Sequence, residues 1–251
     1  ILLMAFAGLQ LYLEISSEKI IRTETVRYES VLKPQLTYAV NIVPNEIFPG
    51  TAMEEGKTYG KRLLNNIQAD FTMEYSGSKK VPLEIEYQIM AAVNGYKGSE
   101  REKNIYWSKN FPLTGKKTVK EESGIWTGKE KVSFPLTPYD AFTVKAKEIT
   151  GMDVTNELRV SMIGKVTAHT GQEDLETSFD VGLRVPLMED TFQITKDDLS
   201  PINNKVTAAE ESRAPVDMTR AVSMGILLSL CFIGLILLIF FTREPNPQEM
   251  Q

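Results

Sequence analysis

The feature that most constrains this chain is an uncharged stretch, Ala221 to Phe241, with the sequence AVSMGILLSLCFIGLILLIFF. At a helical rise of about 1.5 Å per residue, its length matches the roughly 30 Å hydrocarbon core of a bilayer. Buried helices of soluble proteins are usually shorter and keep a polar face. We therefore predict a C-terminal transmembrane helix over residues 221–241 and a cytoplasmic tail over residues 242–251.

A second apolar run, ILLMAFAGLQLYLEI, occupies residues 1–15 and is too short to span a bilayer unless further residues precede it. We predict that it is an N-terminal transmembrane helix, the remainder of a truncated signal anchor. The alternative is a cleavable signal peptide, because Ala5-Phe6-Ala7 before Gly8 fits a small-x-small cleavage pattern. Two crossings would make a two-pass plasma-membrane protein, and the signal-like start places the main domain outside the cytoplasm.

Composition excludes several classes of function. The net charge of -5 is spread without a block of Lys or Arg, so we expect no nucleic-acid partner. The single cysteine, Cys231, lies inside the predicted membrane helix, which leaves the domain without disulfides or a cysteine-based metal site. The sequence has no Asn-x-Ser/Thr site, which favours a prokaryotic cell surface.

Between the apolar ends, apolar and polar side chains alternate with the period of β-strands. Two hairpins are predicted, one from residues 67–75 and 83–89 around SGSKK, and one from residues 158–168 and 179–187 around Thr170-Gly171. Further short strands are predicted over residues 36–42, 105–113, 132–136 and 191–195. We predict an all-β fold, an antiparallel β-sandwich over residues 16–196, with a barrel or two tandem domains split near residues 95–103 as alternatives.

One helix interrupts the strand pattern. Thr137 as N-cap, Pro138 at the first helical position and Gly151 after the last turn predict a short helix between them. Asn94-Gly95 is typical of a turn, and residues 47–66 carry no sustained period, which predicts a long loop. Residues 197–220 are rich in Asp, Asn, Glu and Ala, which predicts a flexible linker to the membrane helix.

Four segments together resemble a known family: YAVNIVPN (Tyr38 to Asn45), YWSKNFPL (Tyr106 to Leu113), VSFPL (Val132 to Leu136) and VPLMEDTFQI (Val185 to Ile194). Set between two apolar ends, they resemble the bacterial and archaeal family catalogued as domain of unknown function 5305. The resemblance extends over nearly the whole chain. It implies a two-pass surface protein and carries no assigned activity or catalytic residues.

No motif in the sequence predicts catalysis, a cofactor or a metal site. His169 is the only histidine and follows a strand at a turn, which favours a solvated side chain over a catalytic one. Carboxylate doublets such as Glu189-Asp190 and Asp197-Asp198 point to opposite faces of a strand, so we interpret them as solvated surface charge. We predict no catalytic, cofactor-binding or metal-binding residues and no cofactor.

Three residues are candidates for contacts with partners. Trp126 lies between glycines in a polar segment and could anchor a glycan or protein partner, although a tryptophan folded over the core is the alternative. Gly225 and Ser229 are four residues apart in the apolar stretch, a small-xxx-small spacing that lets helices approach closely. We expect them to pack against the N-terminal helix near Ala5 and Gly8.

The function expected from these features is that of a non-enzymatic, membrane-anchored structural or interaction protein of the cell surface, with a protein or envelope partner. The alternatives are a membrane-tethered hydrolase acting on glycans or peptides, and an accessory subunit of a membrane complex. A hydrolase requires carboxylates, or a Ser and a Lys, that converge in a pocket, and only the fold can show this.

Overall fold

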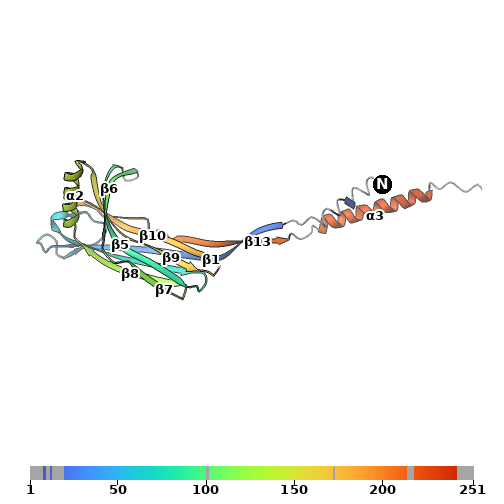
Figure 1. Ribbon diagram of the computed structural model, residues 1–251, viewed down its shortest axis with the longest axis horizontal. Coiled ribbons are helices and arrows are strands. Elements are labelled where there is room, and N and C mark those ends of the chain that lie inside the picture. Colours follow the sequence, from blue (N-terminus) through green and yellow to red (C-terminus); the bar gives the residue numbers. More distant parts are fainter. Residues whose placement is uncertain are drawn as a thin grey trace, which may run out of the picture. The chain divides into compact units, whose positions relative to one another are not determined.

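The computed structural model describes residues 8–9, 12, 20–99, 102–171, 173–213 and 218–241. The chain divides into two compact units (Figure 1). One unit, here called the β domain, is Val26–Thr207, and the other combines Ile1–Thr25 with Ala208–Gln251. Each unit is described by itself below.

Two antiparallel sheets make up most of the structure. The first has the strand order β13-β1-β4-β8 with β2 paired to β1, and the second has the order β12-β10-β9-β5-β6 with β7 paired to β5. The strands of the first sheet are β1 (Ile20–Ile42), β2 (Ala52–Met53), β4 (Leu64–Gly77), β8 (Ile125–Phe134) and β13 (Ile202–Arg213). Those of the second are β5 (Leu83–Ser99), β6 (Glu102–Pro112), β7 (Lys117–Glu121), β9 (Thr155–His169), β10 (Asp174–Pro186) and β12 (Thr195–Lys196).

Smaller elements complete the described structure. Strands β3 (Tyr59–Gly60) and β11 (Thr191–Phe192) pair with each other, and a short 3-10 helix, η1 (Lys61–Leu63), follows β3. The loop predicted over residues 47–66 therefore contains the short strands β2 and β3, the helical turn η1 and the first residues of β4. The longer helices are α2 (Thr137–Thr150) and α3 (Met218–Phe241).

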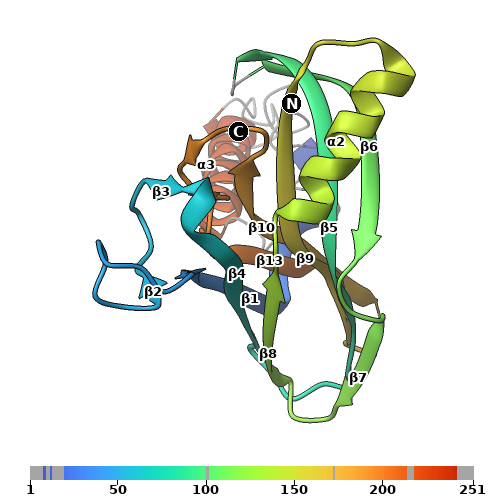
Figure 2. The ribbon, with the colours of Figure 1, turned by 90° about the vertical axis from the view of Figure 1, so that its left-hand side faces the viewer.

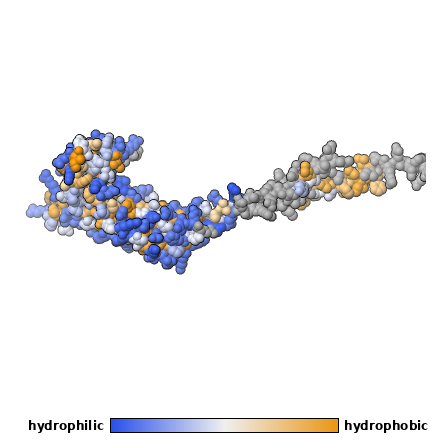
Figure 3. All heavy atoms as spheres, viewed as in Figure 1, coloured by the Kyte–Doolittle hydropathy of each residue, from blue (hydrophilic) through white to orange (hydrophobic). Residues whose placement is uncertain are grey.

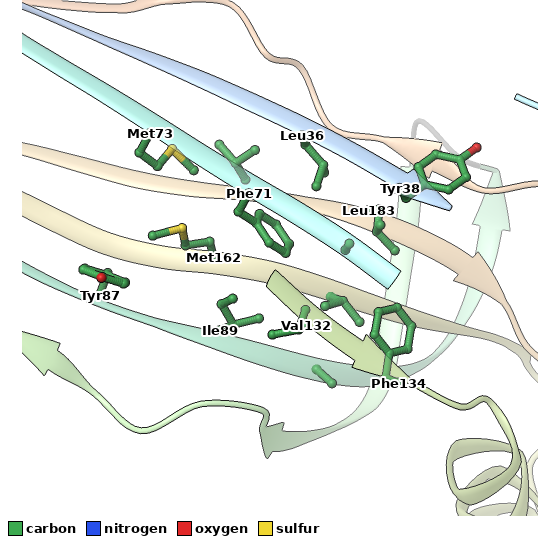
Figure 4. Close-up of a cluster of buried hydrophobic side chains, with 14 of the residues drawn as sticks. Leu36, Tyr38, Phe71, Met73, Tyr87, Ile89, Val132, Phe134, Met162 and Leu183 are labelled. Atoms are coloured by element: carbon green, nitrogen blue, oxygen red, sulfur yellow. The ribbon is translucent and has the colours of Figure 1, made fainter. Parts of the chain in front are cut away.

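The two sheets share one hydrophobic core, to which each strand contributes alternate side chains. Phe71 and Met73 of β4 face Ile89 of β5 and Met162 of β9 (Figure 4), and all four are at most 1% exposed. In Figure 2, β4 and β8 lie across from β5 and β9. The prediction of an all-β fold built from antiparallel strands is confirmed, and the two sheets facing across one core are the arrangement of a sandwich.

The hairpin predicted for residues 67–75 and 83–89 is wrong. Strand β4 pairs with β1 and β8, whereas β5 pairs with β6, β7 and β9 in the other sheet. The connection between them crosses from one sheet to the other. Alternation shows which side of a strand is buried, but it does not show which strand lies beside it. The same pattern arises whether two strands pair in a hairpin or face each other from opposite sheets. The second predicted hairpin is confirmed, because β9 and β10 pair directly from His169 and Asp174.

Asn94-Gly95 forms no turn, because β5 continues through it to Ser99. Gly95 lies opposite Trp107 of β6, and a Cβ atom at Gly95 would lie 2.3 Å from the indole ring. The glycine therefore leaves room for a tryptophan across the strand pair instead of supplying a turn. A break between tandem domains near residues 95–103 is also wrong, since β5 and β6 pair across this region within one sheet.

The linker predicted over residues 197–220 contains the regular strand β13, next to β1 in the first sheet. Ile202 and Val206 pack against the core, and residues 202–208 alternate between partly buried and exposed. A strand at the edge of a sheet buries few side chains, so its composition resembles that of a linker. The segment before residue 36 is likewise part of β1, which begins at Ile20 and lies between β13 and β4.

Helix α2 confirms the predicted helix. Its cap differs by one residue, since Leu136 is the N-cap, and Gly151 ends the helix with a left-handed φ of 63°. The buried side comprises Tyr139, Thr143 and Ala146, whereas Ile149 is 74% exposed. The rings of Trp107 and Phe111 of β6 meet the ring of Phe142 edge to face, so α2 packs against the edge strand of the second sheet.

The other unit contains segments from both the N-terminal and the C-terminal part of the chain. Thr25 Oγ1 donates a hydrogen bond to the Ala208 carbonyl at 3.3 Å, and a Cβ atom at Gly8 would lie 3.7 Å from Leu228 of α3. Most of residues 1–15 and all of residues 242–251 lie outside the described part of the chain. Among the residues described, no helix is long and apolar enough to cross a membrane.

Candidate binding cleft

A cleft of about 640 Å³ lies at one end of the β domain. Its volume falls within the range of about 300–1,000 Å³ typical of ligand sites. The walls come from the ends of β5, β6, β9 and β10 and from the segment that contains β11 and β12. The lining residues are Thr58, Tyr96, Lys103, Thr155, Glu157, Arg184, Pro186, Glu189, Thr191, Phe192, Gln193, Thr195 and Lys196.

One wall is a short segment with strand-like alternation. Phe192 and Ile194 are 2% and 7% exposed and point into the core, whereas Thr191, Gln193 and Thr195 are exposed toward the cleft. Burial of the two apolar residues fixes the backbone, and the period of two then places the three polar side chains on the opposite side. The wall therefore presents polar groups on an anchored backbone.

Pairing with other strands holds both ends of this wall. Thr191 and Phe192 pair with Gly60 and Tyr59 of β3, and Thr195 pairs with Arg184 of β10. The rings of Phe192 and Tyr59 lie 5.6 Å apart, and Gln193 Nε2 donates a hydrogen bond to Thr58 Oγ1 at 2.9 Å. A wall held at three points is pre-organised, so binding would cost little ordering of this segment.

Four of the charged side chains of the cleft, Lys103, Glu157, Arg184 and Lys196, form ion pairs. Lys103 forms an ion pair with Glu157, and its ammonium lies 4.4 Å from the centre of the Tyr96 ring. Lys196 Nζ lies 3.2 Å from Glu55 Oε2. The carboxylate of Glu157 is only 10% exposed, so its burial is tolerated because Lys103 neutralises it.

Asp197 joins two arginines below the wall. Its Oδ2 accepts hydrogen bonds from Arg159 Nη2 at 2.6 Å and from the Gly182 amide at 3.0 Å, and its Oδ1 lies 2.6 Å from Arg184 Nη2. Arg159 also donates to Asp180 Oδ2 at 2.9 Å. Burial disfavours the charge of Arg159, but the hydrogen bonds to Asp180 and Asp197 outweigh this effect and raise the pKa of the guanidinium. The interpretation of Asp197 as solvated surface charge is therefore wrong.

The structure places Trp126 in the core, where it is 5% exposed. Its ring lies 5.6 Å from the ring of Tyr87 and 6.5 Å from that of Phe179. Trp126 belongs to β8, whose alternation directs it inward, so the alternative of a tryptophan within the core describes its position. A contact of this side chain with a partner would require the core to open.

The other sequence candidates are not among the residues that line the cleft. Ser229 is exposed on α3 and donates a hydrogen bond to the Gly225 carbonyl at 3.0 Å, and a Cβ atom at Gly225 would meet no atom within 4 Å. Packing of this pair against another helix stays a prediction. His169 is partly exposed, and its Nδ1 lies 3.0 Å from Asp174 Oδ1 across the β9–β10 turn.

Sequence reasoning missed the cleft residues because they come from distant parts of the chain. Thr58, Tyr96 and Arg184 meet only through the pairing of β3, β5 and β10 with their neighbours. The alternation in TFQIT predicted a short strand over residues 191–195, and its polar side was the one local signal of a lined surface. Within the described ranges, no three His, Cys, Asp or Glu side chains lie close enough to hold a metal ion.

Comparison with family models matches residues 107–251 to the family of unknown function DUF5305. This chain belongs to that family. The match begins within β6 and includes most of the lining of the cleft, from Thr155 to Lys196. Comparison with curated proteins gave no match.

Proposed function

We propose that this DUF5305 member is a membrane-anchored interaction protein whose β domain lies outside the cytoplasm and docks a protein or envelope partner. The observation that carries the proposal is the apolar surface of α3. Figure 3 shows hydrophilic residues over much of the β domain and apolar residues along α3. This apolar surface and the uncharged sequence of residues 221–241 together support a membrane anchor.

Large apolar side chains are exposed along α3. At about 100° per residue, neighbours such as Leu237 and Leu238 point in different directions, and both are more than half exposed. Contiguous apolar surface of this kind is typical of contact with a membrane or a partner. The exposed side chains are Val222, Ile226, Leu227, Leu230, Phe232, Ile233, Ile236, Leu237, Leu238, Phe240 and Phe241.

Two contacts between described residues of the N-terminal and C-terminal segments support a second anchor. Gly8 lies against Leu228, and Thr25 is hydrogen-bonded to Ala208, so the segments that lead into and out of the β domain meet within one unit. An N-terminal segment beside α3 is the arrangement expected of a two-pass protein. Both termini would then lie in the cytoplasm, and the β domain would lie on the other side.

The cleft supports binding rather than catalysis. Lys103, Arg184 and Lys196 each have a carboxylate partner, which holds them as structural cations instead of free acids or nucleophiles. A docking role is therefore the function that this geometry supports best.

Cysteine accessibility would test the anchor and its sidedness, because Cys231 is the only native cysteine. In a Cys231→Ala background, Ser123→Cys places a thiol at an exposed position of the β domain. We expect a membrane-impermeant maleimide to label this thiol in intact cells, whereas native Cys231 is labelled only after detergent is added. Carbonate washing should leave the protein in the membrane fraction. Release by carbonate would overturn the anchor, and labelling of Ser123→Cys only after lysis would overturn the orientation.

A further inference from the structure

We propose that the cleft of the β domain binds an uncharged oligosaccharide segment of a surface glycan. The inference rests on the proposed function, since it names the chemical class of the docked partner. Three properties of the cleft carry it: the uncharged polar side chains of its lining, the pairing of its cations with carboxylates, and its anchored wall.

The lining is rich in groups that both donate and accept hydrogen bonds. Four threonine hydroxyls and the Gln193 amide face the cleft. Sugar hydroxyls also act as donors and acceptors, so each of these side chains can either donate to a sugar hydroxyl or accept from it. Gln193 Nε2 already donates to Thr58 Oγ1, but an apolar ligand would leave the hydroxyls of the other three threonines without partners, at a cost in free energy for each. The threonines are Thr58, Thr155, Thr191 and Thr195.

The charge balance disfavours an ionic ligand. Each cation of the lining is neutralised within the domain, Lys103 by Glu157, Arg184 by Asp197 and Lys196 by Glu55. A phosphate or uronate would have to compete with these carboxylates. The remaining charged lining residue, Glu189, is exposed and would repel an anion while accepting hydrogen bonds from hydroxyls.

Recognition would use hydrogen bonds more than stacking on aromatic rings. Lys103 covers one face of the Tyr96 ring, and Phe192 is buried in the core. The polar side chains of the 191–195 wall are instead presented by a backbone that is paired at both ends. This rigidity lowers the entropic cost of holding a flexible glycan chain.

The test is binding of the full chain, in lipid nanodiscs, to an array of neutral hexose and N-acetylhexosamine oligosaccharides and the same backbones carrying uronate or sulfate. Nanodiscs avoid the sugar headgroups of maltoside detergents. Thr191→Val with Thr195→Val removes two hydroxyls of the wall at nearly constant shape. Thr118→Val with Thr127→Val is the matched control, because both residues are exposed and neither lines the cleft.

We expect binding to neutral glycans that is at least about fivefold weaker in the wall variant and unchanged in the control. No binding to the neutral glycans, binding to the acidic ones alone, or equal binding by both variants would overturn the inference. Carbonate extraction of the membranes from which the chain is purified tests the membrane anchor separately from the saccharide site. A chain that stays in the membrane but binds no neutral glycan refutes the saccharide site and leaves the anchor standing.

Discussion

The environment of Tyr87 shows how one buried hydroxyl couples the core to charged side chains at its edge. Its hydroxyl donates to Glu130 Oε1 at 3.0 Å, and Lys117 Nζ lies 2.6 Å from the same oxygen. The ring also contacts Trp126. Burial and the hydrogen bond to Glu130 raise the pKa of Tyr87 to about 12. The phenol therefore stays protonated in the folded protein at a pH where an exposed tyrosine ionises.

This shift predicts a loss of stability in alkali. Below a pH of about 10 the folded and unfolded chains are both protonated at Tyr87; between about 10 and 12 only the unfolded chain ionises, which lowers the free energy of unfolding. Tyr87→Phe should lower the free energy of unfolding by about 1–2 kcal/mol at neutral pH. Between a pH of about 10 and 12 the variant should lose less of its free energy of unfolding than the wild type does. Urea denaturation at several pH values measures the difference. A gap between the two proteins that is constant up to pH 12 would contradict the assignment.

At the scale of an element, Asp197 fastens the end of the cleft wall to β9 and β10. Its amide donates to the Gly182 carbonyl at 2.9 Å, and its carboxylate pairs with Arg159 and Arg184. Its neighbour Asp198 is exposed and accepts hydrogen bonds from Ser200. The two aspartates have the same chemistry and adjacent positions, but the fold gives them different environments.

We predict that Asp197→Ala lowers the free energy of unfolding by about 3 kcal/mol, because Arg184 loses its carboxylate partner and the largely buried Arg159 keeps only Asp180. Asp198→Ala is the control and should change stability by less than about 1 kcal/mol. Chemical denaturation measures both variants. Hydrogen exchange should also show faster exchange at residues 191–197 in the first variant alone. Equal effects of the two substitutions would argue against the role of Asp197 in holding the wall.

At the scale of the whole molecule, the proposed anchor makes depth in the bilayer the property that decides the cost of a charge. Leu230 lies near the middle of the apolar stretch and Phe241 at its end, and both side chains are exposed on α3. Leu230→Arg should cost about 2.5–3.5 kcal/mol of insertion free energy, whereas Phe241→Arg can reach the interface. We expect only the first to lower the carbonate-resistant fraction. Equal retention of the two variants would count against a spanning α3.

Much of the β domain could be predicted locally. Helix α2, the β9–β10 hairpin and the burial of the alternating residues follow from short-range patterns, since capping and period depend on neighbours in the chain. The strand β13 was missed because an edge strand with one buried side has the composition of a linker. The cleft was missed because Thr58, Tyr96 and Arg184 are far apart in sequence.

The sequence by itself determined the antiparallel β class, the end of a helix at Gly151, the turn at Thr170-Gly171, the family, and the uncharged stretch from which the anchor is inferred. Only the tertiary structure decided that β4 and β5 belong to opposite sheets, that Gly95 makes room for Trp107, and that Asp197 is paired while Asp198 is solvated. The physical reason is that alternation specifies which face is buried. Strand partners are selected by packing and hydrogen bonds between residues that only the folded chain brings together.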